Sequence, residues 1–324
     1  MTKSLLLKAL LIIFAWLLSF SGFAQQIVDE SMPVDKGIIV EVEHVKGKMK
    51  ILGWDKDVVS VVGTLSENTD EFIFDRRGNT VRVIVKEKRT SRNNWYDSDS
   101  KGDDLVIHIP QTGRLDYTTT NTDVQLSNIH GGVDAEVVNG DMRVENVSGR
   151  VRLEAVNGDI SVQQISGEMN IETVNGEITG SHQQGNSMVL STVNGDIDMA
   201  SVARKLEVET VNGDIKLKLA EVSEIELSSV NGDMDVAMHL LSEGYVSAST
   251  VGGKVDLAFQ PDVAARFEIE GHAGGSIKNQ LSDDKPEKAK YGPRRWLDFA
   301  TQNATANVDV STVNGRVILR KTSS

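Results

Sequence analysis

The 324-residue chain has a formal net charge of −13, no cysteine and only 5% aromatic residues. The excess of acidic side chains argues against nucleic acid and anionic lipid as partners. Without cysteine the chain forms no disulfides, and it is long enough to bury a core without them.

The N-terminus has the pattern of a signal peptide, predicted over residues 1–24. Lys3 and Lys8 precede and flank an apolar run that is too short to span a bilayer. Gly22 and Ala24 supply the small residues of a cleavage site. Cleavage removes two lysines and no acid, which changes the formal charge from −13 to −15. We therefore predict an extracytoplasmic mature chain, periplasmic or at the cell surface, with no membrane span.

Residues 25–115 indicate β-structure without a regular repeat. Runs such as 38–42 and 81–85 are rich in β-branched residues and are punctuated by Gly, Asn and Asp. Arg77-Gly78-Asn79 joins two of these runs as a predicted hairpin turn. We predict an irregular N-terminal β cap, because the end of a repeat stack otherwise exposes a strand edge.

A polar loop near the end of this cap contains candidate binding residues. Asp97 and Asp99 resemble the start of a calcium-binding loop, although Lys101 occupies the fifth position and the twelfth lacks the expected Glu. Trp95 and Tyr96 are candidates for partner binding. The alternative is an ordinary exposed polar loop.

The rest of the chain repeats one phrase, Val-Asn-Gly-Asp/Glu followed by Ile or Met. Its regular copies begin at Val138, Val156, Val174, Val193, Val211 and Val230. Looser copies follow near Val251 and Val313, and Asn121 begins an earlier variant. A period of 18 to 19 residues predicts identical units stacked on one another.

The apolar residues within one repeat change phase twice. Val151, Leu153 and Ala155 occupy alternate, odd-numbered positions, which we call one phase. Ile160 and Val162 occupy even-numbered positions, which are the other phase. Each change of phase indicates a corner at which the chain turns and keeps its apolar side inward. Asn and Gly suit such corners because they accept a positive φ at low cost.

These observations predict an all-β fold, a flattened two-sheet parallel β-solenoid with about 18 residues per coil, over residues 116–324. An antiparallel meander is the alternative, since Asn-Gly is also a strong hairpin signal. A meander would leave one apolar face uncovered, and the sequence contains no helical segment to cover it. Residues 279–306 interrupt the period and are predicted to form an inserted loop.

The acidic residue of the phrase recurs in one position of the coil. The members of this row are Asp141, Asp159, Glu177, Asp196, Asp214 and Asp233. Stacking would place them about 4.8 Å apart, where they are candidates to bind Ca²⁺ or a cationic peptide. The alternative is that they are solvated and cap backbone N–H groups at the corners. The glycine-rich nonapeptide of calcium-binding β-rolls is absent, which argues against calcium.

A basic and aromatic segment lies within the predicted inserted loop. Arg294, Arg295 and Trp296 are candidates for partner binding, and packing against the protein's own coils is the alternative. The six histidines show no metal-ligand spacing, and no nucleophile motif such as Gly-x-Ser-x-Gly occurs. We therefore predict no catalytic residue and no cofactor.

The tandem Ser/Thr-Val-Asn-Gly-Asp phrases, with Tyr291-Gly292-Pro293 before a closing Ser311–Gly315, resemble the bacterial putative-adhesin (DUF4097) family of β-strand-repeat proteins. This is a domain of unknown function. The resemblance implies an extracytoplasmic β-solenoid connected with surface adhesion or envelope stress. It supplies no catalytic residues to carry over.

We therefore predict an exported, non-enzymatic, adhesin-like binding or structural module of the cell envelope, with a protein, cationic peptide or surface ligand as its partner. One alternative is a polysaccharide-active lyase or hydrolase, as on other β-helices. The acidic charge and the scarcity of aromatic residues argue against it. The other alternative is a binder of divalent cations or cationic peptides in envelope stress sensing.

Overall fold

The computed structural model describes residues 26–88 and 102–322, which form strands joined by turns and contain no helix. Within these ranges there is accordingly no helix long and apolar enough to cross a membrane. The all-β prediction is confirmed. The predicted signal peptide and the loop residues Trp95, Tyr96, Asp97 and Asp99 lie outside the described residues.

The strands fall into an N-terminal, a central and a C-terminal group. The N-terminal strands are β1 (Gln26–Pro33), β2 (Ile39–Trp54), β3 (Val58–Leu65), β4 (Thr69–Arg77), β5 (Thr80–Glu87) and β6 (Asp103–Pro110). The central strands are β7 (Arg114–Ser127), β8 (Val133–Asn139), β9 (Met142–Glu145), β10 (Ser148–Asn157), β11 (Ile160–Asn175), β12 (Ile178–Gln184), β13 (Ser187–Asn194), β14 (Ile197–Ser201), β15 (Lys205–Asn212), β16 (Ile215–Asn231), β17 (Met234–Gly252) and β18 (Lys254–Phe259). The C-terminal strands are β19 (Ala265–Gly271), β20 (Ser276–Asn279), β21 (Glu287–Lys288), β22 (Arg295–Ala300), β23 (Ala306–Thr312) and β24 (Arg316–Lys321).

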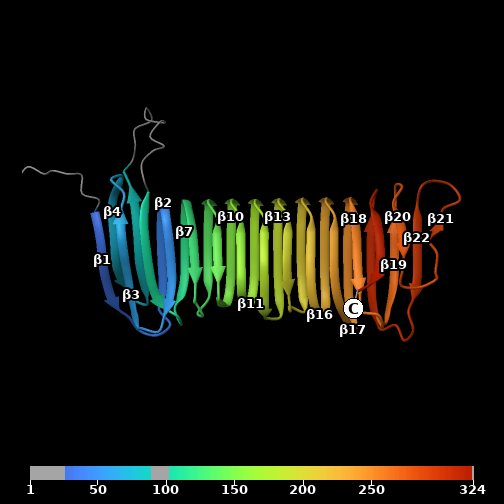
Figure 1. Ribbon diagram of the computed structural model, residues 1–324, viewed down its shortest axis with the longest axis horizontal. Helices are drawn as coiled ribbons and strands as arrows, with labels where there is room; N and C mark the ends of the chain where they lie inside the picture. Colours follow the sequence, from blue (N-terminus) through green and yellow to red (C-terminus); the bar gives the residue numbers. More distant parts are fainter. Residues whose placement is uncertain (1–25, 89–101, 323–324) are drawn as a thin grey trace, which may run out of the picture.

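Strands β7 to β16 each pair in parallel with the strand one repeat further along the chain. Val151 lies opposite Met169, and Ile160 lies opposite Ile178. Asn157 lies opposite Asn175, so the repeated phrase stays in register from coil to coil. The strands therefore stack along one long axis (Figure 1). The antiparallel meander is excluded for this region, because its neighbouring strands run parallel.

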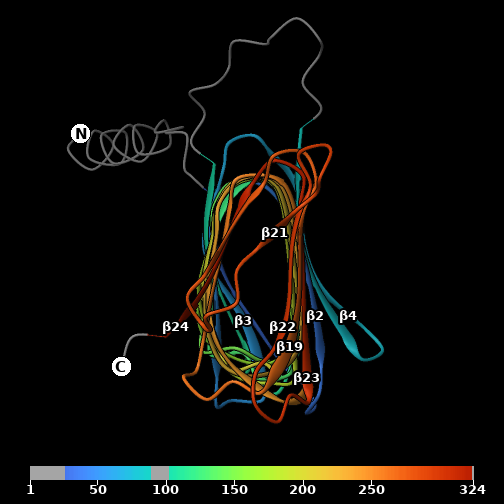
Figure 2. The same cartoon turned by 90° about the vertical axis from the view of Figure 1, so that its right-hand side faces the viewer.

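The coils form two walls that face each other. The first wall contains the segments that precede each Val-Asn-Gly, such as 151–155, and the second contains those that follow it, such as 160–163. Seen along the axis, the strands superpose into these two opposed walls (Figure 2). Leu153 from the first wall and Ile160 from the second are fully buried between them. The inward positions read from the two phases are confirmed.

The Asn-Gly corner is shaped by close approach between coils. A Cβ on Gly158 would lie 2.0 Å from the carbonyl oxygen of Gly140, so only glycine is accommodated. The Asn side chains form a ladder, in which Asn157 donates its amide to Asn139 and Asn175 donates to Asn157, both at 2.9 Å. Our expectation of positive φ at this corner is met by glycines such as Gly140, with φ of 132°, but is wrong for the asparagines, which instead form the ladder.

Asparagines with positive φ occur at the other corner. Asn128 and Asn146 have φ of 59° and 52° there, and Asn146 donates its amide to Asn128 at 2.7 Å. The physical argument for asparagine with positive φ therefore applies to the corner between the second and first walls.

At the C-terminal end, the order of coils in space differs from their order in the chain. Strand β23 pairs in parallel with β17 on one side and with β19 on the other. Strand β24 likewise lies between β18 and β20. The last coil of the chain, β23–β24, is therefore inserted between two coils that come earlier in the sequence. In Figure 1 its red strands lie between the orange strands of β17–β18 and those of β19–β20.

The N-terminal end repeats this arrangement. Strand β2 pairs in parallel with β7 on one side, and with β5 and β6 on the other. Antiparallel strands then complete the end: β4 pairs with β5, β3 pairs with β6, and β1 pairs with β3. The predicted hairpin turn at Arg77-Gly78-Asn79 is confirmed, since Arg77 lies opposite Thr80.

Part of the segment predicted as an inserted loop, 279–306, forms strands. Strand β22 lies antiparallel to β19 and pairs with the two-residue strand β21. Leu297 and Phe299 of β22 are buried, and the Phe299 ring stacks on Phe267 with a centroid distance of 4.6 Å. This segment therefore closes the C-terminal end of the core.

Candidate functional site

The outer surface of the first wall carries a groove that runs along the stack. Its volume is about 360 Å³, and it crosses several consecutive coils. Carboxylates of Glu136, Glu154 and Glu172 lie along one side, and valines such as Val156 and Val174 lie along the other. The two sides are two residues apart in each strand, so both rows point outward and the inward residue between them forms the floor.

The valine side of the groove is an exposed apolar row. The row continues along the stack beyond the groove, and its members, which are 39–46% exposed, are Val138, Val156, Val174, Val193, Val211, Val230 and Val251. The first four of these line the groove. Each is the valine of the repeated phrase. The residue before each valine is inward and buried, as at Thr173 and Thr192, and strand alternation then turns the valine outward.

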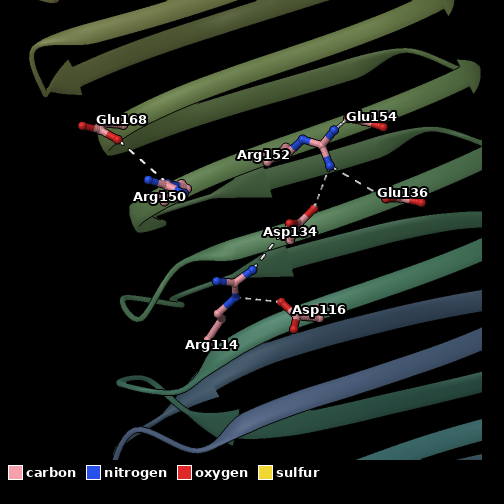
Figure 3. A network of polar contacts seen from close by, with 8 residues as sticks. All are labelled: Arg114, Asp116, Asp134, Glu136, Arg150, Arg152, Glu154 and Glu168. Carbon is pink, nitrogen blue, oxygen red and sulfur yellow. Dashed lines mark hydrogen bonds and ion pairs between the residues drawn. The ribbon is translucent and has the colours of Figure 1, made fainter.

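An arginine network occupies the first wall beside the groove (Figure 3). Arg114 donates from Nε to Asp116 at 2.8 Å and from a terminal nitrogen to Asp134 at 3.5 Å. Arg152 pairs with Glu154 and approaches Asp134 and Glu136 at 3.8 and 3.9 Å. Successive coils are thus linked by charge, and the acids outnumber the arginines in this cluster.

Glu154 is the carboxylate most affected by its surroundings in the groove. Burial raises its pKa, and Arg152 acts in the opposite direction. The carboxylates of Glu172, Glu136 and Asp134 raise the pKa further by repulsion. The net effect is a raised pKa, because burial and the neighbouring acids together outweigh the one arginine. A cation in the groove would therefore relieve unfavourable electrostatics.

The acidic row predicted from the repeated phrase lies on the second-wall side of the Asn-Gly corner. Its carboxylates accept backbone N–H groups from the next coil: Asp141 accepts from Asp159 at 3.1 Å, and Asp214 accepts from Asp233 at 2.8 Å. Asp159 accepts from the N–H of Glu177 in the same way. This geometry is that of corner capping. Across residues 26–88 and 102–322, no three His, Cys, Asp or Glu side chains are grouped to hold a metal.

Two of the predicted C-terminal partner residues contact each other. The guanidinium of Arg294 lies over the ring of Trp296, 5.6 Å from its centroid, and donates to Glu270 at 2.5 Å. Arg295 is half-buried and lies opposite Gly271. The exposed tip of this hairpin is Tyr291, which is 83% exposed. Trp296 is half-buried, whereas Arg294 remains exposed.

Sequence reasoning placed the acidic row but missed the groove. Ala155 was predicted to be inward, so the outward direction of the next residue, Val156, followed from alternation and was available as a signal. The position of Arg152 among Asp134, Glu136 and Glu154 was not available, because it depends on how neighbouring coils align.

These repeats, corners and closed ends can be compared with known proteins. The model of the Toastrack DUF4097 family matches residues 55–320. The chain belongs to this family. The resemblance inferred from the repeated phrase is therefore confirmed. No curated protein matches the chain.

Several solved structures resemble this Toastrack chain along most of its length. A putative adhesin from Bacteroides fragilis has 12% identity and a TM-score of 0.39, and the match covers 91% of this chain and 98% of that one. A putative adhesin from Parabacteroides distasonis has 8% identity and a TM-score of 0.36, with 92% and 98% covered. A putative cell adhesion protein from Clostridium sporogenes has 9% identity and a TM-score of 0.24, with 92% and 100% covered. Likenesses this distant carry no argument about function.

Proposed function

We propose that the protein is an exported, non-enzymatic, adhesin-like binding module built as a flattened two-sheet parallel β-solenoid. Its ligand is an extended cationic polypeptide that lies along the groove of the first wall. The observation that carries this proposal is the pairing of a valine row with a glutamate row over consecutive coils.

The two rows suit a ligand that is both basic and apolar. A lysine or arginine side chain can place its charge against Glu154 or Glu172 and its methylene groups against Val156 or Val174. Successive coils repeat this surface every ~4.8 Å, so affinity accumulates along an extended ligand. The chain's charge of −13 adds long-range attraction for a cationic partner.

Each exposed ion pair contributes only ~0–1 kcal/mol, so several pairs are needed for measurable binding. Binding should therefore weaken as salt is added. The proposal includes no metal, because the Oδ1 atoms of Asp141, Asp159 and Asp214 already accept backbone N–H groups.

The test measures binding of an alternating Lys-Val peptide of about ten residues to the mature protein by calorimetry at low and high salt. Glu154→Gln with Glu172→Gln should weaken binding at least ~5-fold, which corresponds to loss of about 1 kcal/mol. Val156→Ser should also weaken it, because the ligand's methylene groups lose their apolar contact.

The matched control is Glu145→Gln, which removes one charge from an exposed glutamate on the second wall. It should change the affinity less than twofold. Equal losses for Glu145→Gln and for the groove variants would leave only non-specific charge attraction and would contradict the groove as the site. Export is tested separately, by finding whether the chain fractionates outside the cytoplasm after loss of residues 1–24.

A further inference from the structure

We infer that strand β4 is a self-association surface through which two copies of this chain pair antiparallel, end to end. Strand β4 is the outermost strand of the first wall at the N-terminal end. It pairs with β5 on one side, and no other described strand pairs with it. In the end-on view it stands at the side of the stack (Figure 2). Within residues 26–88 and 102–322, the backbone N–H and C=O groups of its other edge therefore have no strand partner.

The sequence of β4 is complementary to itself when two copies run antiparallel. It reads Thr-Asp-Glu-Phe-Ile-Phe-Asp-Arg-Arg, with acids near its start, three apolar residues in the middle and two arginines at its end. Pairing centred on Ile73 places Asp70 opposite Arg76 of the second copy. The same pairing places Phe72 opposite Phe74 of that copy, so that charge and apolar contacts both match.

The one unfavourable pair in this register is already compensated within each chain. Glu71 would lie opposite Asp75 of the second copy. However, Lys86 donates to Glu71 at 2.8 Å, and Arg82 binds Asp75 through two hydrogen bonds of 2.8 and 2.6 Å. These partners come from β5, so the like charges at the interface are neutralised before the copies meet.

The apolar face of β4 is also incompletely covered. Phe72 and Phe74 pack against the end of the core but remain only partly buried. A second copy paired at this edge would bring the two ends of the core together and cover both aromatic pairs. Burial of apolar surface would then add to the backbone hydrogen bonds.

The other edge at this end has the opposite character. Strand β1 pairs with β3 alone among the described strands, and its sequence contains Asp29, Glu30 and the terminal Pro33. Two antiparallel copies of β1 would bring acids together, and proline cannot donate a hydrogen bond. The occupant assigned to the β4 edge is therefore a second copy, specifically through β4.

The first test is sedimentation equilibrium of the mature protein over a wide concentration range. A dimer is expected, and Ile73→Lys should raise its dissociation constant at least ~10-fold by placing two ammonium groups opposite each other. Val202→Lys, which places the same charge at an exposed position in the middle of the stack and away from the groove, should leave it unchanged. A monomer at all concentrations, or a dimer insensitive to Ile73→Lys, overturns the inference.

The second test uses the absence of cysteine from the chain. In the proposed register Ile73 faces itself, and opposed Cα atoms lie ~4.5–5.5 Å apart, within the range of a disulfide. Ile73→Cys should therefore cross-link the dimer on oxidation. Glu71→Cys on the same strand is the control, because its own copy would lie ~14 Å away. Equal cross-linking of both variants overturns the register.

A charge exchange tests the complementarity directly. Asp70→Arg should weaken the dimer by opposing two arginines, and Asp70→Arg with Arg76→Asp should restore it. Arg76 also pairs with exposed Asp35, and such pairs contribute little to folding, so thermal melting should show that the double variant is folded. Failure of the folded double variant to recover dimerisation overturns the inference.

Discussion

The central coils and the two ends of this stack are built from the same kind of strand but are assembled differently. In the centre, order in the chain and order in space agree, and each strand pairs with one a single repeat away. At the ends, β2 and the β23–β24 coil are inserted between coils that are distant from them in sequence. A repeated phrase is sufficient for the centre, whereas each end requires contacts over long loops, which cost more entropy to form.

The largest expected effect comes from removing the inserted C-terminal coil. Deleting residues 306–324 takes away the strands that join β17–β18 to β19–β20. Amides of residues 265–300 should then exchange with deuterium at least ~10-fold faster, because the end becomes a separate, weakly held unit. Hydrogen-exchange mass spectrometry provides the measurement.

Strands β10 to β15 serve as the internal control in that experiment, since their neighbours are unchanged. Their protection should be retained. If residues 265–300 remain as protected as in the intact chain, the inserted coil is not what holds the C-terminal end, and the contrast between centre and end is lost.

A smaller but still severe effect is expected from Gly158→Ala in the centre. The new Cβ would lie 2.0 Å from the carbonyl oxygen of Gly140, so one coil must move away from the next. We expect a loss of about 3 kcal/mol in the free energy of unfolding, measured by urea denaturation.

Gly252, at the boundary between the regular coils and the C-terminal end, is the matched comparison. It occupies the asparagine position of the corner opposite Asn231, and a Cβ there would meet nothing closer than 3.9 Å. Gly252→Asn should be tolerated, and should stabilise by up to ~1 kcal/mol by extending the amide ladder. Equal destabilisation by both substitutions would show that coil spacing does not explain the corner glycines.

A third effect concerns a buried pair at the N-terminal end. The side chain of His44 in β2 contacts Asp103 in β6 at 2.9 Å, and both are buried. Burial acts to raise the pKa of Asp103, but hydrogen bonds from His44, the Ser66 N–H and Thr69 outweigh it, and the net pKa is lowered. A lowered folded-state pKa means that Asp103 stabilises the protein at neutral pH.

The stability that Asp103 contributes should begin to be lost when the pH falls to the ordinary carboxyl pKa of about 3.9. It should be lost completely below the lowered pKa of Asp103 in the folded protein. Asp103→Asn should cost about 2 kcal/mol at neutral pH, because it leaves buried groups poorly paired. Urea denaturation at pH 7 and at about pH 3, below the ordinary carboxyl pKa, checks both points. The variant should lose less stability than the natural chain between these two pH values, and an identical loss would contradict the assignment.

Much of the centre was predictable from the residues alone. The two phases of Val151–Ala155 and Ile160–Val162 identified the inward positions, because side chains alternate along a strand. The turn at Arg77-Gly78-Asn79 was also recognisable, since it lies between two β-rich runs. The function of the asparagine in the repeated phrase was misread, because the sequence does not show that Asn139 and Asn157 bond to each other across coils.

The candidate groove was harder to predict. Its glutamates follow buried residues and therefore face outward, and the valine side likewise depends on recognising that Val156 and Val174 follow buried residues. The placement of Arg152 among three acids required the alignment of neighbouring coils. Such contacts join residues that are remote in sequence, and no local pattern reports them.

The sequence by itself determined the repeat length, the strand phases, the corner glycines and the family, because each follows from a pattern confined to one coil or repeated in the next. Only the tertiary structure decided that the first and last coils are inserted between others, that Asp103 meets His44, and that β4 is left with an open edge. These features depend on which distant segments share a neighbour. The packing of the whole chain determines which segments pair, and no repeated sequence pattern indicates this pairing.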